Sequence, residues 1–252
     1  MKLTNKSEID QFFREIHDEG NDVNLSCSHM EVFNTMSRII GHTFFVVDFL
    51  RRKFVYVSNH PLFLCGHSPS EALEMGYAFF KEIVVEEDLE LLVAMDKKGH
   101  DLISQLSLEE RMESIISVDY RLKQPEGANI LVTQKNTLFF VEGEEPRFAL
   151  CTINLSANGT PGHMKVIVNN VPHDYMYSFK TRRWKTVHPV QFSKREKEII
   201  TLSTQGFSNE EIANTLFIDI STVKFHRRNI FSKLGVKNIA EAILSVYNNN
   251  LI

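Results

Sequence analysis

Apolar and polar residues are arranged in two different patterns along this chain. Residues 43–49, 52–58, 115–123, 129–141 and 147–156 form short apolar runs bounded by polar turns, which predicts strands. Between the second and third runs, residues 59–92 are broken by Pro and Gly and are typical of short helices. After Pro189 the apolar residues recur at helical spacing. We therefore expect an α+β protein with an antiparallel sheet and helices, followed by an all-α segment of four helices.

The same pattern predicts how the chain is divided. Ser28-His-Met-Glu31 begins a helix that ends at Gly41, and two further runs, 163–168 and 175–184, extend the sheet. A basic segment that ends in Pro, residues 180–190, is the predicted linker. We expect a helical extension over 1–29, a domain over 30–157, a strand-containing extension and linker over 158–188, and a second domain over 189–252.

The last sixty residues contain several helix start and stop signals. Ser193-Lys-Arg-Glu196 and Ser208-Asn-Glu-Glu211 are capping boxes, in which a Ser accepts from an orphan N–H and a Glu reaches back to the cap. Gly206 and Gly235 are placed to end helices in the left-handed conformation. The predicted second, third and fourth helices span about 209–216, 221–234 and 239–247. Two short helices joined by a turn of about four residues have helix-turn-helix spacing.

Composition restricts the class of protein. The 252 residues are 43% hydrophobic and 24% charged, and the longest apolar run is far shorter than the roughly 20 residues that span a bilayer. The N-terminus has no apolar stretch of the kind found in secretory signals. Cys27, Cys65 and Cys151 are odd in number and widely spaced, so neither disulfides nor a thiolate metal site is indicated. We expect a cytoplasmic protein without a membrane partner.

The net charge of −4 argues at first against nucleic acid, but the charge is unevenly distributed. Residues 1–188 hold 20 Lys and Arg against 26 Asp and Glu, whereas residues 189–252 hold 8 against 6, so the second part has a charge of +2. Between residues 220 and 240 there are five basic residues and no acidic one. A local excess of this kind matters more for binding phosphate than the overall sum.

The predicted helix over 221–234 has two distinct faces on a helical wheel. Its inward face consists of Val223, Ile230 and Leu234, with Phe231 at the margin. The opposite face contains Ser221, Lys224, Phe225, Arg228 and Ser232, while Thr222, Asn229 and Lys233 lie to the side. Arg and Lys can reach guanine in the major groove, and an aromatic group can contact a thymine methyl. We expect Lys224, Phe225 and Arg228 to read bases, and Ser221, Thr222, Asn229 and Lys233 to contact the DNA backbone.

The segments Phe192 to Ile200, Gly206 to Ala213 and Ser221 to Val236 closely resemble the LuxR-type (GerE-like) DNA-binding domain. This resemblance implies a compact helix-turn-helix module that binds double-stranded DNA as a dimer, often through its last helix. It places Lys224, Phe225 and Arg228 at base-reading positions, and Thr222 and Lys233 at positions that touch the backbone. The matching positions Glu196, Gly206 and Ile212 are structural in that family.

Residues 30–156 resemble a PAS domain. Phe54 to Asn59 followed by Phe63 to Ala72 is similar to the strand-to-helix passage of that family, and Ile83 to Leu89 to its later acidic helix start. The resemblance implies a sensory or dimerising domain that receives a small-molecule or protein signal. The residues expected to line a ligand cavity are Phe45, Val47, Val55, Val57 and Phe63. The sequence identifies no cofactor, and we expect none.

Three readings of the whole chain remain. The first is a homodimeric transcriptional regulator that senses a signal, binds operator DNA and contacts the transcription machinery. The second is a protein-interaction scaffold with incidental DNA contact, and the third is a ligand-binding or enzymatic PAS-like domain. Phosphorylation control is not expected, because Asp48 lacks the acidic cluster of a receiver domain. No catalytic constellation is apparent, so an enzyme is not expected.

Overall fold

The structure is a computed structural model that describes most of the chain, namely residues 5–14, 16, 25–41, 43–139, 147–169, 171–249 and 251–252. Parts of the expected helical extension over 1–29 therefore lie outside the described residues. The chain divides into two compact units, the first formed by Met1–Leu155 and Thr160–Val187, and the second by Ser156–Gly159 and His188–Ile252. Within the described residues, no helix has the length and apolar character needed to cross a bilayer.

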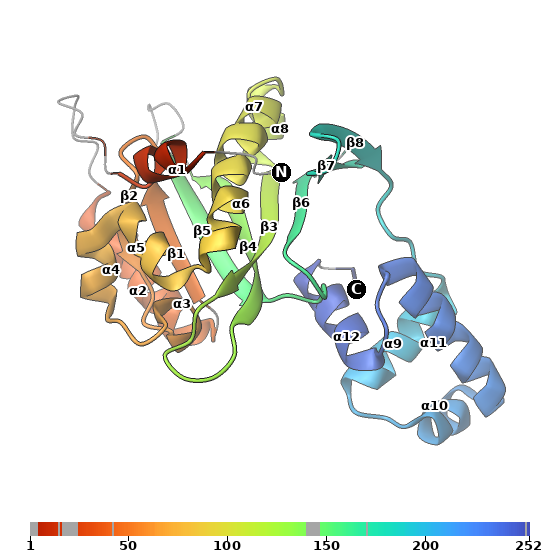
Figure 1. Cartoon of the computed structure of the whole chain (residues 1–252). Coiled ribbons are helices and arrows are strands. Elements are labelled where there is room, and N and C mark those ends of the chain that lie inside the picture. The colour runs from red at the N-terminus through yellow and green to blue at the C-terminus, as the bar shows by residue number, and fades with distance from the viewer. Residues whose placement is uncertain are drawn as a thin grey trace. The chain divides into compact units, whose positions relative to one another are not determined.

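The first unit is built on an antiparallel sheet of eight strands in the order β2-β1-β5-β4-β3-β6-β7-β8 (Figure 1). Its strands are β1 Thr43–Asp48, β2 Lys53–Val57, β3 Ser114–Leu122, β4 Ile130–Phe139, β5 Phe148–Leu155, β6 Gly162–Val168, β7 Asp174–Ser178 and β8 Arg183–Val187. The predicted order of two strands, helices and three strands is confirmed. Together with the helical second unit, this sheet confirms the α+β class.

Short helices occupy the interval between β2 and β3. They are α3 Pro61–Leu64, α4 Pro69–Met75, α5 Phe79–Ile83, α6 Leu89–Ala94, α7 His100–Ile103 and α8 Leu108–Met112, with 3-10 turns at Gly76–Ala78 and Glu86–Asp88 and a π-helical turn at Met95–Gly99. Their apolar side chains pack with those of α1 (Lys6–Phe12) against one face of the sheet, where Val118, Tyr120 and Leu122 are fully buried. This is the main core of the unit.

A further helix, α2 (Cys27–Ile39), packs on the other face of the sheet. Phe33 of α2 contacts the cluster that contains Phe44 and Tyr56, with ring centroids of Phe33 and Tyr56 5.4 Å apart. Strand β1 is consequently buried on both faces. The helix begins one position before the predicted Ser28 start, because Ser26 is the N-cap and His29 reaches back to it.

The last two strands differ from the prediction. The run 175–184 is not one strand but two, because the chain turns at residues 179–182 and returns as β8. The expected linker over 180–190 therefore overlaps a strand. Its basic residues Arg183 and Lys185 are exposed on either side of the half-buried Trp184, and the high charge of the segment obscured this short strand.

The second unit consists of α9 (Lys194–Thr204), α10 (Asn209–Leu216), α11 (Ile220–Leu234) and α12 (Ile239–Asn248). Both predicted capping boxes are formed, at Ser193 and at Ser208. Gly206 and Gly235 have the positive φ angles of 87° and 69° that ending a helix in the left-handed region requires. The core of the unit is made of residues from all four helices: Ile199, Ile200, Ile212, Ala213, Val223, Ile230, Ala242 and Val246.

Candidate functional site

Helix α11 places its apolar and polar residues as the wheel predicts. Val223 and Ile230 are fully buried among α9, α10 and α12. Lys224, Phe225 and Arg228 are exposed on the side away from this core, and 52% of the Phe225 surface is accessible. An aromatic ring left half in water loses the burial that normally stabilises it. The exposed face of α11 is therefore a candidate contact surface.

The two cations on this face have no counter-ion within the part of the chain that the structure describes. Among the described residues, neither Lys224 nor Arg228 forms an ion pair, whereas Arg195 pairs with Glu198 at 2.9 Å on the neighbouring α9. The N-cap Asp219 is the nearest acidic residue in the sequence, and residues 220 to 240 contain none. The exposed face of α11 thus presents uncompensated positive charge, which attracts phosphate.

Two other cations of α11 turn toward their own domain. Arg227 donates from Nη2 to the hydroxyl of Ser203 at 2.9 Å and to the carbonyl of Phe207 at 3.4 Å, and burial lowers its pKa. Lys233 donates from Nζ to Glu196 Oε2 at 2.6 Å and to the Gln191 carbonyl at 3.0 Å. The ammonium of Lys233, which the sequence assigned to the DNA backbone, is therefore held by intradomain contacts.

The turn before α11 exposes a strained aromatic residue. Phe217 has a left-handed φ of 52°, and 94% of its surface is accessible. The Ile218 amide donates to the Ala213 carbonyl at 3.0 Å, which closes the end of α10. Sequence reasoning placed this residue in the turn but missed its exposure, since a Phe between Leu216 and Ile218 is typical of a core position.

A small cavity lies inside the first unit, between the sheet and the π-helical turn. It has a volume of about 70 Å³ and is bounded by residues of β1, β3, β4, β5 and the segment from Met95 to Ile103. A second hollow of about 30 Å³ shares Val47, Tyr77, Met95, Asp96 and Asn136 with the first. Together they leave room for a few waters or a ligand of few heavy atoms.

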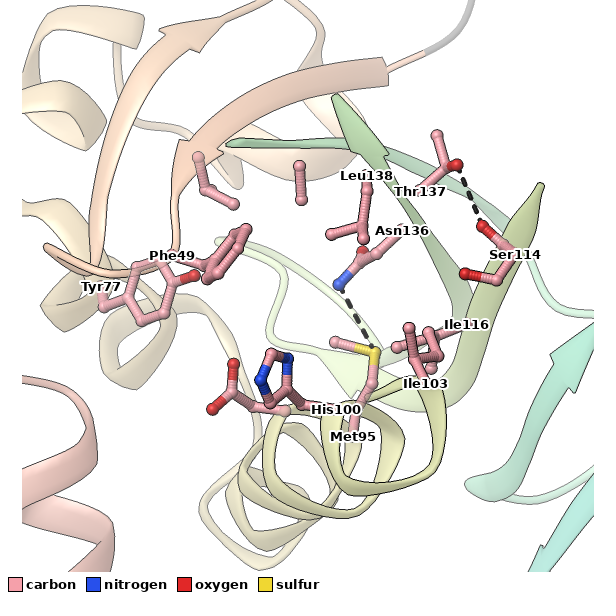
Figure 2. A pocket seen from close by; sticks show the side chains of 13 residues that line it. Phe49, Tyr77, Met95, His100, Ile103, Ser114, Ile116, Asn136, Thr137 and Leu138 are labelled. Carbon is pink, nitrogen blue, oxygen red and sulfur yellow. Dashed lines mark hydrogen bonds between the residues drawn. The ribbon is translucent and has the colours of Figure 1, made fainter. Parts of the chain in front are cut away.

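Polar side chains line this cavity (Figure 2). The amide of Asn136 points toward the Met95 sulfur at 3.7 Å and accepts from Gln134 at 2.8 Å. Burial raises the pKa of Asp96 above its ordinary value, and the positive charges of Arg52 and His100 act in the opposite direction. An ionisable group with a perturbed pKa in a cavity is a common mark of a functional site.

The five residues that the sequence assigned to the cavity have different positions. Phe45 and Val47 line the hollows described above, and Val57 is buried in the same core. Phe63 stacks on Phe45 with ring centroids 4.5 Å apart and so fills core space. Val55 packs in the cluster on the opposite face of the sheet, because a register shift between Val46 and Val47 changes the alternation of β2.

Asp48 is engaged in structural contacts. Its carboxylate forms an ion pair with Arg147 at 2.6 Å and accepts from the Arg51 amide at 3.0 Å, and only 1% of the residue is exposed. A phosphoacceptor would need an accessible carboxylate. This geometry agrees with the expectation, made from the sequence, that Asp48 is not one.

The second unit is a helix-turn-helix domain of the DNA-binding class, because α10 and α11 are joined by a three-residue turn and α11 presents a basic outer face. Residues 190–246 match the family described as bacterial regulatory proteins, luxR family. The predicted LuxR-type domain is thereby confirmed for this part of the chain, and the predicted order of strands and helices precedes it.

Individual relatives are similar over the same region. The response regulator protein VraR of Staphylococcus aureus is 45% identical over 60 residues, which is 24% of this chain and 29% of VraR. The solved structure of the response regulator ChrA of a heme-sensing two-component system is 46% identical over 25% of this chain and 32% of its own, with a TM-score of 0.24. The chain therefore matches less than a third of the length of these relatives.

Other solved structures are similar over more of the chain at low identity. VqmA of Vibrio cholerae, in a complex with ligand and DNA, is 14% identical over 90% of this chain and 89% of its own, with a TM-score of 0.35. A PAS domain from a two-component sensor histidine kinase is 17% identical over 51% of this chain and 99% of its own, with a TM-score of 0.34.

Proposed function

We propose that the protein is a transcription regulator that reads operator DNA through α11. The observation that supports this most is a pair of exposed cations, Lys224 and Arg228, beside the half-exposed Phe225 on one face of the helix; neither cation has an ion pair among the described residues. An aromatic ring that is exposed only to solvent does not stabilise the domain. In the major groove, the same ring meets thymine methyls while Lys and Arg donate to guanine O6 and N7.

The residues around this face fit positioning contacts. Ser221 is exposed at the start of α11, and Thr222 and Asn229 are half-exposed at its side. Hydroxyl, amide and backbone N–H groups of this kind bind phosphate and fix the register of a recognition helix without reading bases. We leave Lys233 out of this set, since Glu196 and Gln191 occupy its ammonium.

The proposed regulator acts as a homodimer joined through α12. The outer face of this helix, with the residues that flank it, forms an open apolar hollow of about 630 Å³ lined by Thr204, Ala240, Ile243, Leu244, Val246, Tyr247 and Ile252. Tyr247 is 62% exposed. A pair of such faces packs by two-fold symmetry and places two copies of α11 on two half-sites about one DNA turn apart.

The first unit is the proposed input domain, and the cavity beside Asp96 is its ligand site. Its volume of about 70 Å³ is below that of the drug-sized pockets of roughly 300 Å³ or more. The ligand is therefore a small molecule that offers a hydrogen-bond donor to Asp96 or Asn136. The flexible side chain of Met95 can adapt to a somewhat larger guest.

Selection of bound sequences from a random DNA duplex pool, using the full-length protein at two salt concentrations, tests this function. Recovery of one palindromic motif, with affinity that falls steeply with salt, is the expected result. Binding that is weak and indifferent to sequence would contradict it, and a tight protein partner found alongside would favour an interaction scaffold instead.

A further inference from the structure

One wall of the cavity is shared with a second apolar cluster. Ile103, Ile116 and Leu138 line the cavity and also pack in the cluster that contains Val166 and Val168 of β6. In Figure 2, Ile103 and Ile116 lie side by side at this wall. A ligand in the cavity would therefore contact side chains that also pack against β6.

Trp184 packs against the same cluster and also against the main core of the unit. Trp184 lies on β8, and its ring is 5.1 Å from that of Tyr177 on β7 in an edge-to-face arrangement. Closely packed side chains transmit displacement because few voids are left to absorb it. Ile103 and Ile116 thus line the cavity and belong to the same packed cluster as Trp184.

The hairpin that contains Trp184 has few backbone bonds to the rest of the sheet. In the described part of the sheet, β6 and β7 are in register at two residue pairs, Lys165 with Met176 and Val166 with Tyr175, whereas β7 and β8 are in register at five. The ion pair of Lys165 with Asp174, 2.5 Å apart, adds one further tie. Side-chain packing therefore decides where this β7–β8 hairpin lies on the sheet.

The hairpin leads directly into the second unit. Strand β8 ends at Val187 and α9 begins at Lys194, so only residues 188–193 separate them. A change in the position of β8 changes the point from which this short connection starts. Figure 1 shows β7 and β8 as the last pair of strands of the sheet, immediately before the chain enters the helical unit.

We propose that Trp184 transmits the state of the cavity to the DNA-binding domain: filling the cavity displaces Ile103 and Ile116, and these reposition Trp184 and with it the β7–β8 hairpin. The inference rests on the proposed function, in that it treats the cavity as the input site and α11 as the output. A ligand shifts DNA affinity only as far as it binds one hairpin position better than the other.

A substitution that fills the cavity takes the place of the unidentified ligand. Ala149 lines the cavity from β5 and is not part of the cluster of Ile103, Val166 and Val168, so Ala149→Val adds volume to the cavity without changing that cluster. Val47→Leu is a second filling variant from β1. Ala72→Val is the matched control. Ala72 lies on α4, is fully buried in the main core and does not line the cavity. Circular dichroism establishes that each variant is folded.

The first readout needs no DNA. Trp184 is the single Trp of the chain, so its emission and its quenching by acrylamide report the hairpin alone. We expect both to change in Ala149→Val or Val47→Leu and to stay unchanged in Ala72→Val. Unchanged emission in folded filling variants would overturn the proposal, whatever the DNA result.

The second readout is affinity for the duplex recovered in the selection. Filling the cavity should change Kd by about fivefold or more, and that change should fall below about twofold when Trp184→Ala is added. Trp184→Phe should restore it. A change of equal size with and without Trp184→Ala would overturn the transmission role. Absence of specific binding by the unsubstituted protein would instead contradict the proposed function, while the emission measurement would still decide the step from cavity to hairpin.

Discussion

Arg227 and Ser203 join two helices of the DNA-binding domain, since Nη2 of Arg227 on α11 donates to the Ser203 hydroxyl on α9 at 2.9 Å. The neighbouring Arg228 points the other way and has no ion pair among the described residues. Two adjacent arginines with identical chemistry thus have different surroundings. The first ties α11 to α9, and the second is exposed on the face that we propose contacts DNA.

Substitution of these two arginines should separate stability from DNA binding. Arg227→Ala removes charged hydrogen bonds to partly buried acceptors and should lower the free energy of unfolding by about 1.5–3 kcal/mol. Arg228→Ala should change stability by less than about 0.5 kcal/mol but weaken operator binding by about 1–3 kcal/mol. Urea unfolding and fluorescence anisotropy measure the two effects. Equal loss of stability in both variants would mean that the faces of α11 are wrongly assigned.

Phe225 should determine preference at a single base pair. Phe225→Ala is expected to leave the salt dependence of binding unchanged, because no phosphate contact is lost, and to weaken binding to a thymine-containing site by about 1–3 kcal/mol. Lys224→Ala is the comparison, since it removes a positive charge from the same face and should also lower the slope of log K against log salt. Titrations with operator variants at three salt concentrations distinguish these outcomes. No change in base preference would exclude Phe225 from readout.

The helix start at Ser193 should be sensitive to acid. Burial would raise the pKa of Glu196, but the hydrogen bonds from Lys233 and Ser193 outweigh burial and lower that pKa below its ordinary value. Because the folded pKa lies below the unfolded value of about 4.3, the stabilisation is present above that pH and is lost as the pH falls through the folded pKa.

Hydrogen exchange of the α9 amides between about pH 3 and pH 7, corrected for intrinsic rates, tests this dependence. Glu196→Gln should flatten the pH dependence and cost about 1–3 kcal/mol at neutral pH. Glu198→Gln, which breaks the exposed pair with Arg195, should cost about 0.3 kcal/mol. A steep acid dependence that survives in Glu196→Gln would assign the effect to another carboxylate.

The outer face of α12 should govern dimerisation. Tyr247→Glu places a charge in the apolar hollow and should convert a two-half-site footprint into binding of single half-sites, because a buried charge at an interface without a partner is costly. Light scattering gives the mass of the free protein, and gel shifts on duplexes with one or two half-sites give the stoichiometry. Glu241→Gln, on the same helix but outside the hollow, is the control. If Tyr247→Glu still forms dimers, α12 is not the dimer interface, and the first unit would be the next candidate.

Much of the second unit could be predicted from the sequence because its signals are local. Capping boxes act over three residues and left-handed glycines over one, so Ser193, Ser208, Gly206 and Gly235 mark the helix ends independently of the rest of the fold. The inward and outward faces of α11 follow from its period alone. What the sequence missed there, the partners of Arg227 and Lys233, depends on contacts between helices.

The cavity was predicted less well because its walls come from distant segments. Val47, Met95, Ile116, Asn136 and Ala149 meet only after the strand order β1-β5-β4-β3 is established. The π-helical turn at 95–99 has no clear sequence signature, and the register shift that removes Val55 from the core depends on how β1 and β2 pair. The apolar pattern alone identified β1 as a wall of the cavity, but it did not identify the polar lining residues Asp96 and Asn136.

Three of the four helices in the second unit begin with a cap supplied by their own preceding residue, namely Ser193, Ser208 and Asn238. Such a module requires nothing from upstream sequence to define its boundaries, which makes it portable between proteins. A module of this kind can therefore be fused behind unrelated input domains and still form its helices at the same residues.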